Sequence, residues 1–584
     1  MNVAGFNQKI EMPDFQSPVR LLSMYKRHGH TNVSVPEYHE MGGKTQGLLI
    51  AYKELADLNQ SSFHGINIDI PEMVVIGTSV FDAFLDRNNL SEIAFSNNKD
   101  SRIAHAFQQG DLPFEILGDL RKLMEAWQMP LAIRSSGLLE DTMQQPFAGV
   151  YLTKMIPNNA TNIDTRFQKL VEAIKFVWAS TYFSIAKDYS KAVNVDFRQE
   201  KMAVIIQKMV GKRHQSRFYP EVSGVIRSYN FYPIKPAKPE DGVVNLALGL
   251  GKTVVDGERT WTYSPKYPAA PPPFKSIQDM LHQTQNDFWV VNMTGDYEYD
   301  PIKETEFMQK ENLLTAEKDG VLDYLVSTLE SGVERLAMGT GVAGPRVLTF
   351  SPLLNLNLLP FNDLISSLLK KFETRLNSPV EIEFAMTFKP TCFSILQVRP
   401  MKIQSINLHI SEQDLVGKNV LIASKFVLGN GVIEGLTDIV YVRPNQFDRS
   451  VTKQIAKELE AINNKLLNAN RPYILIVFGR LGTVDPWLGI PITWGKICGA
   501  KVIVEASKED VNIELSQGSH YFHNIINLDV KYFNMPITQS FQIHWDWFER
   551  QKAEMEGEFT RHILLSAPLT VKVDGKSGWG LISI

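Results

Sequence analysis

The stretch LAIRSSGLLEDTMQQPFAGVY, residues 131–151, does not have the pattern of one ordinary strand or helix. An apolar run leads directly into Arg134, Ser135 and Ser136, and Glu140 follows a few residues later. The apolar run predicts a buried strand, so the arginine and the two hydroxyls are expected at its polar end. Their role depends on which other residues the chain brings to the ends of its strands.

The whole chain has the composition of a soluble globular protein, with 44% hydrophobic and 21% charged residues. Its 584 residues are too many for one core, so roughly two to four domains are expected. No apolar run approaches the roughly 20 residues of a membrane-spanning helix, and no signal peptide opens the sequence. A net charge of −4 without a basic block argues against a nucleic-acid partner. Cys392 and Cys498 suit neither a disulfide framework nor a zinc site and favour a reducing cytosol.

The pattern of the sequence changes near residue 404, which indicates a domain boundary there. Residues 1–40 are mixed and polar and are expected to form an N-terminal arm. Residues 41–403 contain a helix from Gly42, a helix over 317–338 and a hairpin over 378–401, whose strands flank a Lys-Pro-Thr turn. Residues 404–584 are richer in β-strands with glycine turns, and the segment GAKVIVEA (499–506) has the pattern of a buried parallel strand, which predicts a smaller C-terminal α/β domain.

Polar residues and glycines recur at strand ends or within apolar strands. Outside the opening stretch they are Lys44, Gln207, Ser223, Gly249, Gly251, Gln397 and Arg399. Glu381 and Glu383 lie two residues apart on one strand and therefore point to the same face. On an apolar strand such a pair is costly unless it binds cations. Glutamates that face lysine and arginine across a cleft suit magnesium together with a polyphosphate, because the metal takes carboxylate and phosphate oxygens while the cations take the remaining charge.

Six motifs in a fixed order make the chain similar to a known family over roughly residues 40–402. The motifs are GGKTQGL (42–48), IPEMVVIGT (70–78), AIRSSGLLEDTMQQPFAGVY (132–151), MAVIIQKMV (202–210) with SGV (223–225), ALGLGKTVVDG (247–257), and EIEFAM (381–386) with FSILQVRPM (393–401). The chain resembles the nucleotide-binding domain of the phosphoenolpyruvate synthase and pyruvate, phosphate dikinase family. That resemblance implies an ATP-grasp-like fold within a multidomain α/β and α+β protein.

The resemblance also implies roles for individual residues. Lys44 and Arg134 would hold the phosphates of ATP, and Glu381 and Glu383 would hold magnesium. The remaining nucleotide-binding residues would be Gln207, Gly249, Gly251, Glu381, Gln397 and Arg399, with Arg134 and Arg399 also acting in catalysis. Two positions depart from the family pattern and add positive charge near the cleft: Lys252 replaces the usual glutamate, and Arg227 replaces a small or hydrophobic residue.

Taken singly, these residues also fit plainer structural roles. Arg134 would equally suit an ion pair with Glu140 or Asp141, and the two glutamates would suit a solvated strand face. The Gly-Gly-Lys segment at Lys44 is short and is not the eight-residue phosphate loop. The order of the six motifs favours the family fold, whereas activity remains an expectation, because an inactive relative would keep most of them.

Family enzymes usually add a swivelling domain with a phosphate-carrying histidine and a pyruvate-binding barrel. The roughly 180 residues after position 404 are too few for a (β/α)₈ barrel of about 250 residues. The usual histidine signature is absent, yet a buried strand that ends in Glu505, a loop and His520 keep its outline. A histidine at a helix N-terminus can receive phosphate there, so His520 is predicted to be a phosphocarrier. The alternatives are a capping segment in which Ser519 caps the helix, and transfer to His523 one turn later.

A second cluster in the C-terminal region is FGRLGTVDPWLGIPITW, residues 478–494. Arg480 lies between Gly479 and Gly482, which suits an anion, and two tryptophans offer stacking surfaces. The alternative, which fits the pattern equally well, is a structural twisted turn whose tryptophans pack in the core.

The sequence as a whole predicts a cytoplasmic, ATP- and magnesium-dependent phosphotransferase with an unidentified acceptor. By resemblance, ATP would give its β-phosphate to a histidine and leave AMP and phosphate, as in barrel-less antibiotic phosphotransferases. The alternative is an ATP-binding regulatory or sensor protein without turnover, and a second is a kinase or ligase-like enzyme that uses the ATP-grasp cleft alone. AMP, ADP or no product distinguishes the three, whereas the oligomeric state is left open.

Overall fold

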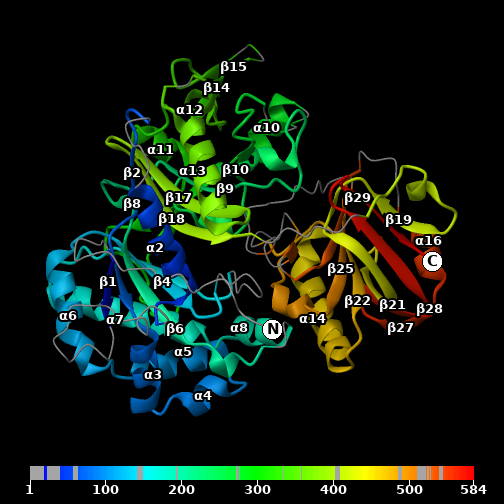
Figure 1. Cartoon of the computed structure of the whole chain (residues 1–584), viewed down its shortest axis with the longest axis horizontal. Coiled ribbons are helices and arrows are strands. Elements are labelled where there is room, and N and C mark those ends of the chain that lie inside the picture. Colours follow the sequence, from blue (N-terminus) through cyan, green and yellow to red (C-terminus); the bar gives the residue numbers. More distant parts are fainter. Residues whose placement is uncertain are drawn as a thin grey trace.

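The computed structural model shows an α/β protein with several sheets, in which the C-terminal part lies to one side of the rest (Figure 1). It describes residues 19–22, 40–56, 63–140, 149–192, 195–270, 272, 274, 276–331, 333, 335–356, 358–401, 408–483, 489–508, 521, 525–526, 528–537 and 543–584. Among these residues, no helix is long and apolar enough to cross a membrane.

The opening stretch of the sequence forms the fourth strand of a five-stranded sheet, as its apolar run predicted. The order is β1 (Val19–Leu22), β3 (Met73–Ile76), β6 (Met202–Lys208), β4 (Leu131–Gly137) and β5 (Thr153–Ile156). One face of this sheet packs in a core with helices α3 (Thr78–Arg87), α5 (Asp100–Gln109), α6 (Phe114–Ala126) and α7 (Ile163–Ser180). Along β6, Val204 and Ile206 point to that core, whereas Ala203 and Ile205 join the core of the second sheet. Alternation along the strand thus explains why β6 is apolar on both faces.

A six-stranded sheet forms the second wall of the same region (Figure 1). Its order is β11 (Trp261–Tyr263), β10 (Val243–Ala247), β9 (Val222–Arg227), β17 (Val380–Phe388), β18 (Thr391–Pro400) and β2 (Asn67–Asp69). β17 and β18 are the predicted hairpin, which is confirmed. Helix α2 (Gly42–Ala56) packs so tightly on β18 that a Cβ on Gly47 would lie 2.2 Å from the carbonyl oxygen of Val398. The helix that carries Lys44 therefore rests on the strand that carries Gln397 and Arg399.

Two smaller sheets complete this part of the chain, and one of them corrects the sequence interpretation. The first contains β13 (Met308–Asn312), β12 (Asp287–Asn292), β8 (Arg217–Tyr219) and β7 (Lys212–His214). The second contains β15 (Leu336–Met338), β14 (Val326–Leu329) and β16 (Arg346–Leu348). The helix expected over 317–338 is wrong, because α11 (Leu313–Lys318) ends there and β14 and β15 follow. Gly320, at φ +71°, lies just beyond the helix end, and the β-branched residues of the VSTL segment favour a strand.

The C-terminal part contains a nine-stranded mixed sheet. Its strands are, in order, β19 (Val420–Ser424), β29 (Trp579–Ser583), β28 (Thr560–Asp574), β21 (Asn430–Val442), β22 (Tyr473–Phe478), β25 (Ala500–Ala506), β26 (Lys531–Met535) and β20 (Val427–Leu428), with β27 (Ala553–Glu556) beside β28. β21, β22, β25 and β26 are parallel to one another, and the parallel arrangement predicted for the segment of β25 is confirmed. Helix α14 (Thr452–Asn468) contributes its apolar face to the same core.

The two parts of the chain share one continuous apolar core. Buried side chains of the five-stranded sheet and its helices join those of the C-terminal sheet in a single cluster. At the junction, helix α8 (Ser184–Ala192) meets the short 3₁₀ helix η6 (Trp494–Ile497). A Cβ on Gly495 would lie 2.7 Å from the Cβ of Asp188. This close approach fixes the C-terminal part against the first sheet.

Candidate functional site

The start of helix α2 is fixed by one of the two hydroxyls that end β4. Gly42 has φ +70°, and a Cβ there would lie 1.7 Å from the carbonyl oxygen of Ser136. The Ser136 hydroxyl donates to the carbonyl oxygen of Met41 at 2.7 Å, and the backbone N–H of Thr45 donates to the same hydroxyl at 3.2 Å. The position of Ser136 at the strand end therefore sets the position of the helix.

The second hydroxyl, that of Ser135, belongs to the surroundings of Lys44. The ammonium of Lys44 lies 2.5 Å from a carboxylate oxygen of Glu140 and donates to Ser135 Oγ at 3.0 Å. The other oxygen of Glu140 accepts from the backbone N–H of Gly137 at 3.1 Å. Glu140 is 1% exposed, whereas the Lys44 side chain is 13% exposed. The lysine is thus held in place by a buried carboxylate while its side chain still reaches solvent.

Arg134 connects the two large sheets. Its Nη1 donates to the carbonyl oxygen of Leu396 on β18 at 2.6 Å and to Gln207 Oε1 on β6 at 3.3 Å. Its Nη2 donates to Gln397 Oε1 at 3.1 Å and to Glu383 Oε2 at 3.3 Å. Arg134, Gln207, Glu383 and Gln397, which the sequence analysis assigned to one nucleotide site, therefore lie within hydrogen-bonding distance of one guanidinium. The alternative ion pair with Glu140 is not formed, because Glu140 binds Lys44.

Glu381 lies between two arginines. One of its oxygens accepts from Nε and Nη2 of Arg399 at 2.8 and 2.5 Å, and the other is paired with Arg227. All three side chains are buried, with Glu381 at 1% and Arg227 at 0% exposure. Burial lowers the pKa of the Arg227 guanidinium, and Glu381 opposes that shift. The strand register explains the arrangement, because Glu381 is the direct neighbour of Arg227 on β9 and of Arg399 on β18.

The glycine segment before Lys252 forms a close turn. Gly249 has φ +85°, and a Cβ there would lie 2.7 Å from the carbonyl oxygen of Trp289. The short helix α9 (Lys252–Val255) follows, and the Lys252 ammonium lies 2.9 Å from Asp256 and 3.2 Å from Glu304. Burial would lower the pKa of Lys252, but these two carboxylates outweigh it and hold that pKa above its ordinary value. The positive charge that Lys252 adds is therefore neutralised by Asp256 and Glu304.

This geometry can be set beside known proteins. Residues 38–419 match the family model described as pyruvate phosphate dikinase, AMP/ATP-binding domain. The chain belongs to this family. The match covers the segments that carry Lys44, Arg134, Glu383 and Arg399, and it confirms the family resemblance found in the sequence.

Three relatives illustrate the similarity. The chain is 28% identical over 199 residues to the uncharacterized phosphotransferase YvkC of Bacillus subtilis, which covers 34% of this chain and 21% of that protein. It is 32% identical over 132 residues to a phosphoenolpyruvate synthase of Aeropyrum pernix, which covers 22% and 14%. It is 23% identical over 231 residues to a rifampicin phosphotransferase of Bacillus subtilis, which covers 37% and 24%. The matches therefore span less than a quarter of each relative's length.

In the C-terminal part of this dikinase-family chain, a buried acid lies at the end of β25. Glu505 accepts from the backbone N–H of Leu481 at 2.8 Å and from the hydroxyl of Tyr532 at 2.5 Å. Burial raises its pKa to about 7, although both hydrogen bonds oppose the shift. Arg480, which begins the short strand β23 (Arg480–Leu481), donates to the carbonyl oxygen of Gly257 at 2.6 Å. This edge of the C-terminal sheet therefore contacts the nucleotide-binding part just beyond α9.

Several predicted residues of the C-terminal part lie outside the described residues. They are Ser519, His520 and His523 of the phosphocarrier segment and Trp487 of the glycine-rich cluster. Trp494 is described and is 4% exposed, which agrees with the alternative of a core tryptophan. The side chain of Arg480 donates to a backbone carbonyl, and its predicted role in binding an anion stays a prediction.

Sequence reasoning missed one polar cluster in the C-terminal sheet. Asp438, Glu554 and His562 are grouped closely enough to hold a metal ion. Arg471 already binds both carboxylates, at 2.5 Å from Asp438 and 2.6 Å from Glu554, while His562 Nε2 lies 2.7 Å from Asp438. A divalent ion would have to displace this guanidinium, so the cluster is a structural ion-pair network. His562 is 0% exposed and out of reach of a phosphate donor.

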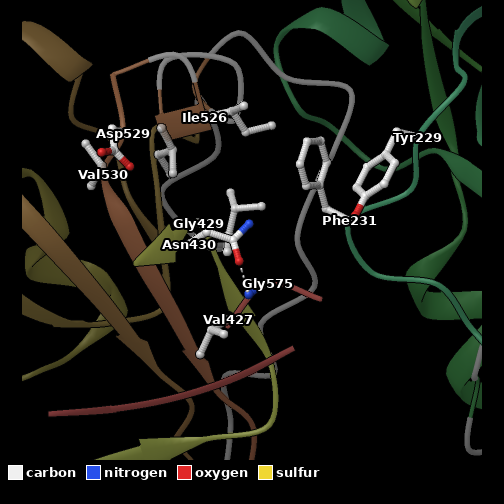
Figure 2. A pocket seen from close by; sticks show the side chains of 11 residues that line it. Tyr229, Phe231, Val427, Gly429, Asn430, Ile526, Asp529, Val530 and Gly575 are labelled. Atoms are coloured by element: carbon white, nitrogen blue, oxygen red, sulfur yellow. Dashed lines mark hydrogen bonds between the residues drawn. The ribbon is translucent and has the colours of Figure 1, made fainter. Parts of the chain in front are cut away.

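A pocket with an empty volume of about 450 Å³, its open mouth included, lies between the two parts of the chain (Figure 2). It is lined by Tyr229, Phe231, Val427, Leu428, Gly429, Asn430, Ile525, Ile526, Asp529, Val530 and Gly575. The Asn430 side chain accepts from the backbone N–H of Gly575 at 2.8 Å and so ties two of its walls together (Figure 2). None of the predicted phosphate-binding residues lines this pocket. It is therefore distinct from the group of residues around Arg134.

Proposed function

We propose that this chain is an ATP- and magnesium-dependent phosphotransferase that binds the nucleotide between its two large sheets, in the manner of an ATP-grasp fold. The observation that carries the proposal is the convergence of Arg134, Gln207, Glu383 and Gln397 from four separate strands. Lys44, Arg134 and Glu383 are 13%, 11% and 16% exposed. They are therefore close enough to solvent to meet a ligand, yet held by buried partners.

The side chains present fit both ATP and magnesium. Lys44 and Arg134 supply positive charge for the phosphates, with Arg399 at the phosphate end, and Gln207 and Gln397 supply amide groups. The tight turn at Gly249 and Gly251 brings backbone N–H groups toward the nucleotide. Magnesium prefers oxygen ligands and usually combines one or two carboxylates with substrate phosphates. The sequence assigns this role to Glu381 and Glu383, and bound magnesium would neutralise charge on the transferring phosphate.

The proposed division of labour follows the sequence. Residues 41–403 would form the nucleotide-binding unit, residues 1–40 an arm, and residues 404–584 a domain related to the phosphohistidine domain. With water, ATP would give its β-phosphate to His520 and leave AMP and inorganic phosphate. The acceptor that next receives the phosphate is unidentified.

Three observations support this route. The contact of Arg480 with Gly257 brings the edge of the C-terminal sheet, where β25 ends and the His520 segment follows, next to the nucleotide-binding part. The three relatives described above are named as two phosphotransferases and a synthase. The two cysteines are free, which suits a reducing cytoplasm.

The test is incubation with β-labelled ATP and magnesium, followed by separation of AMP from ADP and analysis of labelled protein. We expect AMP and an acid-labile, base-stable label that is lost in His520→Ala. His544→Ala, a change at an exposed histidine, is the matched control and should retain the label. Loss in His523→Ala alone would move the role to that residue, and ADP as the product would indicate a direct kinase.

The alternative function is an ATP-binding regulatory protein without turnover. The observation that favours it is that Lys44, Arg134 and Arg399 each already pair with a carboxylate. A nucleotide that merely competes for these cations would shift the contact between the sheets. Tight ATP binding without AMP or ADP would support this alternative.

A further inference from the structure

The two glutamates of β17 have different surroundings, although the sequence treats them as an equal pair. Both oxygens of Glu381 are engaged by guanidinium groups, one by Arg399 and the other by Arg227. Glu383 makes one longer contact, at 3.3 Å to Arg134, and its side chain is 16% exposed against 1% for Glu381. The strand therefore presents one accessible carboxylate and one enclosed carboxylate.

The charge around Glu381 is unfavourable for a divalent cation. Two buried arginines flank its carboxylate, and guanidinium groups remain protonated in proteins. A metal that bound Glu381 would have to separate it from a buried arginine. Breaking a buried ion pair on one side is strongly destabilising, because the remaining charge is left without a partner. At Glu383 the metal would displace a single hydrogen bond near solvent.

We infer that Glu381 is a positioning residue and not a magnesium ligand, and that Arg227 is the residue that removes it from the metal site. Glu383 is then the member of the pair that meets the metal. Glu381 acts through Arg399, whose Nε and Nη2 it holds by two hydrogen bonds. This inference rests on the proposed function, since it assumes that the cleft binds a metal–nucleotide complex.

The experiment measures nucleotide affinity with and without metal. A non-hydrolysable ATP analogue is titrated by calorimetry into the full chain, once with Mn²⁺ and once with a chelator. The Kd with the chelator divided by the Kd with Mn²⁺ reports the contribution of the metal to affinity. Glu383→Gln should lower that ratio by about tenfold or more, as loss of a metal contact typically does. Glu381→Gln should weaken binding in both conditions by the same factor and leave the ratio as in the wild type. Glu317→Gln, which removes a distant partner of Arg346, is the control and should change neither value.

The outcomes separate this inference from the proposed function. If the wild-type chain does not bind the analogue at all, the proposed function fails. If it binds, and Glu381→Gln lowers the metal ratio as much as Glu383→Gln, the inference is overturned and the two glutamates share the metal.

A second measurement does not depend on the folding of a variant. Anomalous diffraction from wild-type crystals with Mn²⁺ and the analogue locates the metal directly. We expect the metal about 2 Å from a Glu383 oxygen, with Arg227 and Arg399 still bound to Glu381. A metal bonded to Glu381 would refute the inference.

Discussion

The guanidinium of Arg134 on β4 lies 2.6 Å from the carbonyl oxygen of Leu396 on β18, although 262 positions separate the two residues in the sequence. This hydrogen bond joins the five-stranded sheet to the six-stranded sheet. An arginine that was expected to face phosphate is thus also a structural connection between the two walls of the cleft. A ligand that binds Arg134 would act on both walls at once.

Substitution of Arg134 should therefore affect stability and nucleotide binding together. Arg134→Met removes the donors to Leu396, Gln207 and Gln397, and we expect a loss of roughly 1–3 kcal/mol in the free energy of unfolding. ATP should bind much more weakly, whereas adenosine, which lacks phosphate, should be little affected. Urea unfolding and calorimetric titration with both ligands measure the two effects.

The matched control for this change is Arg217→Met. Arg217 is paired with Asp319 at 2.7 Å and is not among the predicted nucleotide-binding residues. It should lower stability without altering the preference for ATP over adenosine. An Arg134 variant that loses stability but keeps that preference would show that the arginine is only structural.

Gly42 should not tolerate a side chain. Gly42→Ala would place a Cβ 1.7 Å from the carbonyl oxygen of Ser136 at a φ of +70°. We expect a loss of about 1–3 kcal/mol or more in the free energy of unfolding, because the start of α2 must move, and weaker ATP binding, because Lys44 moves with it. Gly118→Ala is the control: nothing lies within 4 Å of its added Cβ, and in mid-helix it should stabilise the chain by about 0.5–1 kcal/mol. Equal effects of both changes would contradict the close approach.

Lys252 should matter less for ATP than Arg134. Its ammonium is already neutralised by Asp256 and Glu304, which hold its pKa above the ordinary value. Lys252→Met should change ATP affinity by less than about threefold, or roughly 0.7 kcal/mol, and should lower stability because two carboxylates lose their partner. Calorimetric titration and thermal unfolding measure these effects. A loss of ATP affinity as large as in Arg134→Met would show that Lys252 contacts the phosphates.

Glu505 should make stability depend on pH. Its pKa rises from an ordinary 4.5 to about 7 in the folded chain. Between these values the folded chain keeps a proton that the unfolded chain has released, so the free energy of unfolding falls as pH rises through this window. The neutral amide of Glu505→Gln has no such proton, and the stability of the variant relative to wild type should improve by up to about 3 kcal/mol between pH 4.5 and 7.5.

Urea unfolding of both chains at several pH values measures that difference. Glu200, whose pKa burial also raises to about 7, is present in both chains and cancels from the comparison. Parallel stability curves for the two chains would mean that Glu505 ionises normally in the folded state.

Local sequence patterns predicted individual helices and strands, whereas the ion-pair and hydrogen-bond partners of the side chains depend on how the sheets assemble. The hairpin 378–401 and the helix from Gly42 are confirmed, because alternation, a turn signal and two glycines act over a few residues. The family motifs also named Lys44 and Arg134. No local signal could predict that Glu140 pairs with Lys44 rather than with Arg134, because this pairing depends on how α2 packs against two strands.

The same limit explains what the sequence missed. The pairing of Asp438 with Arg471 and His562 spans 33 and 124 positions with no recognisable spacing. The enclosure of Glu381 by Arg227 depends on the register between β9 and β17. Sequence reasoning noted Arg227 as a departure but had no means of placing it beside Glu381.

The core shared by the first sheet and the C-terminal sheet has a consequence for how the protein unfolds. Domains with separate cores usually melt independently, whereas a continuous apolar cluster that includes both parts couples their unfolding. Heating should therefore give one calorimetric transition whose measured enthalpy equals the van't Hoff enthalpy. A nucleotide bound beside Arg134 would then protect distant backbone amides of the C-terminal sheet from hydrogen exchange, because they open only when the whole molecule does.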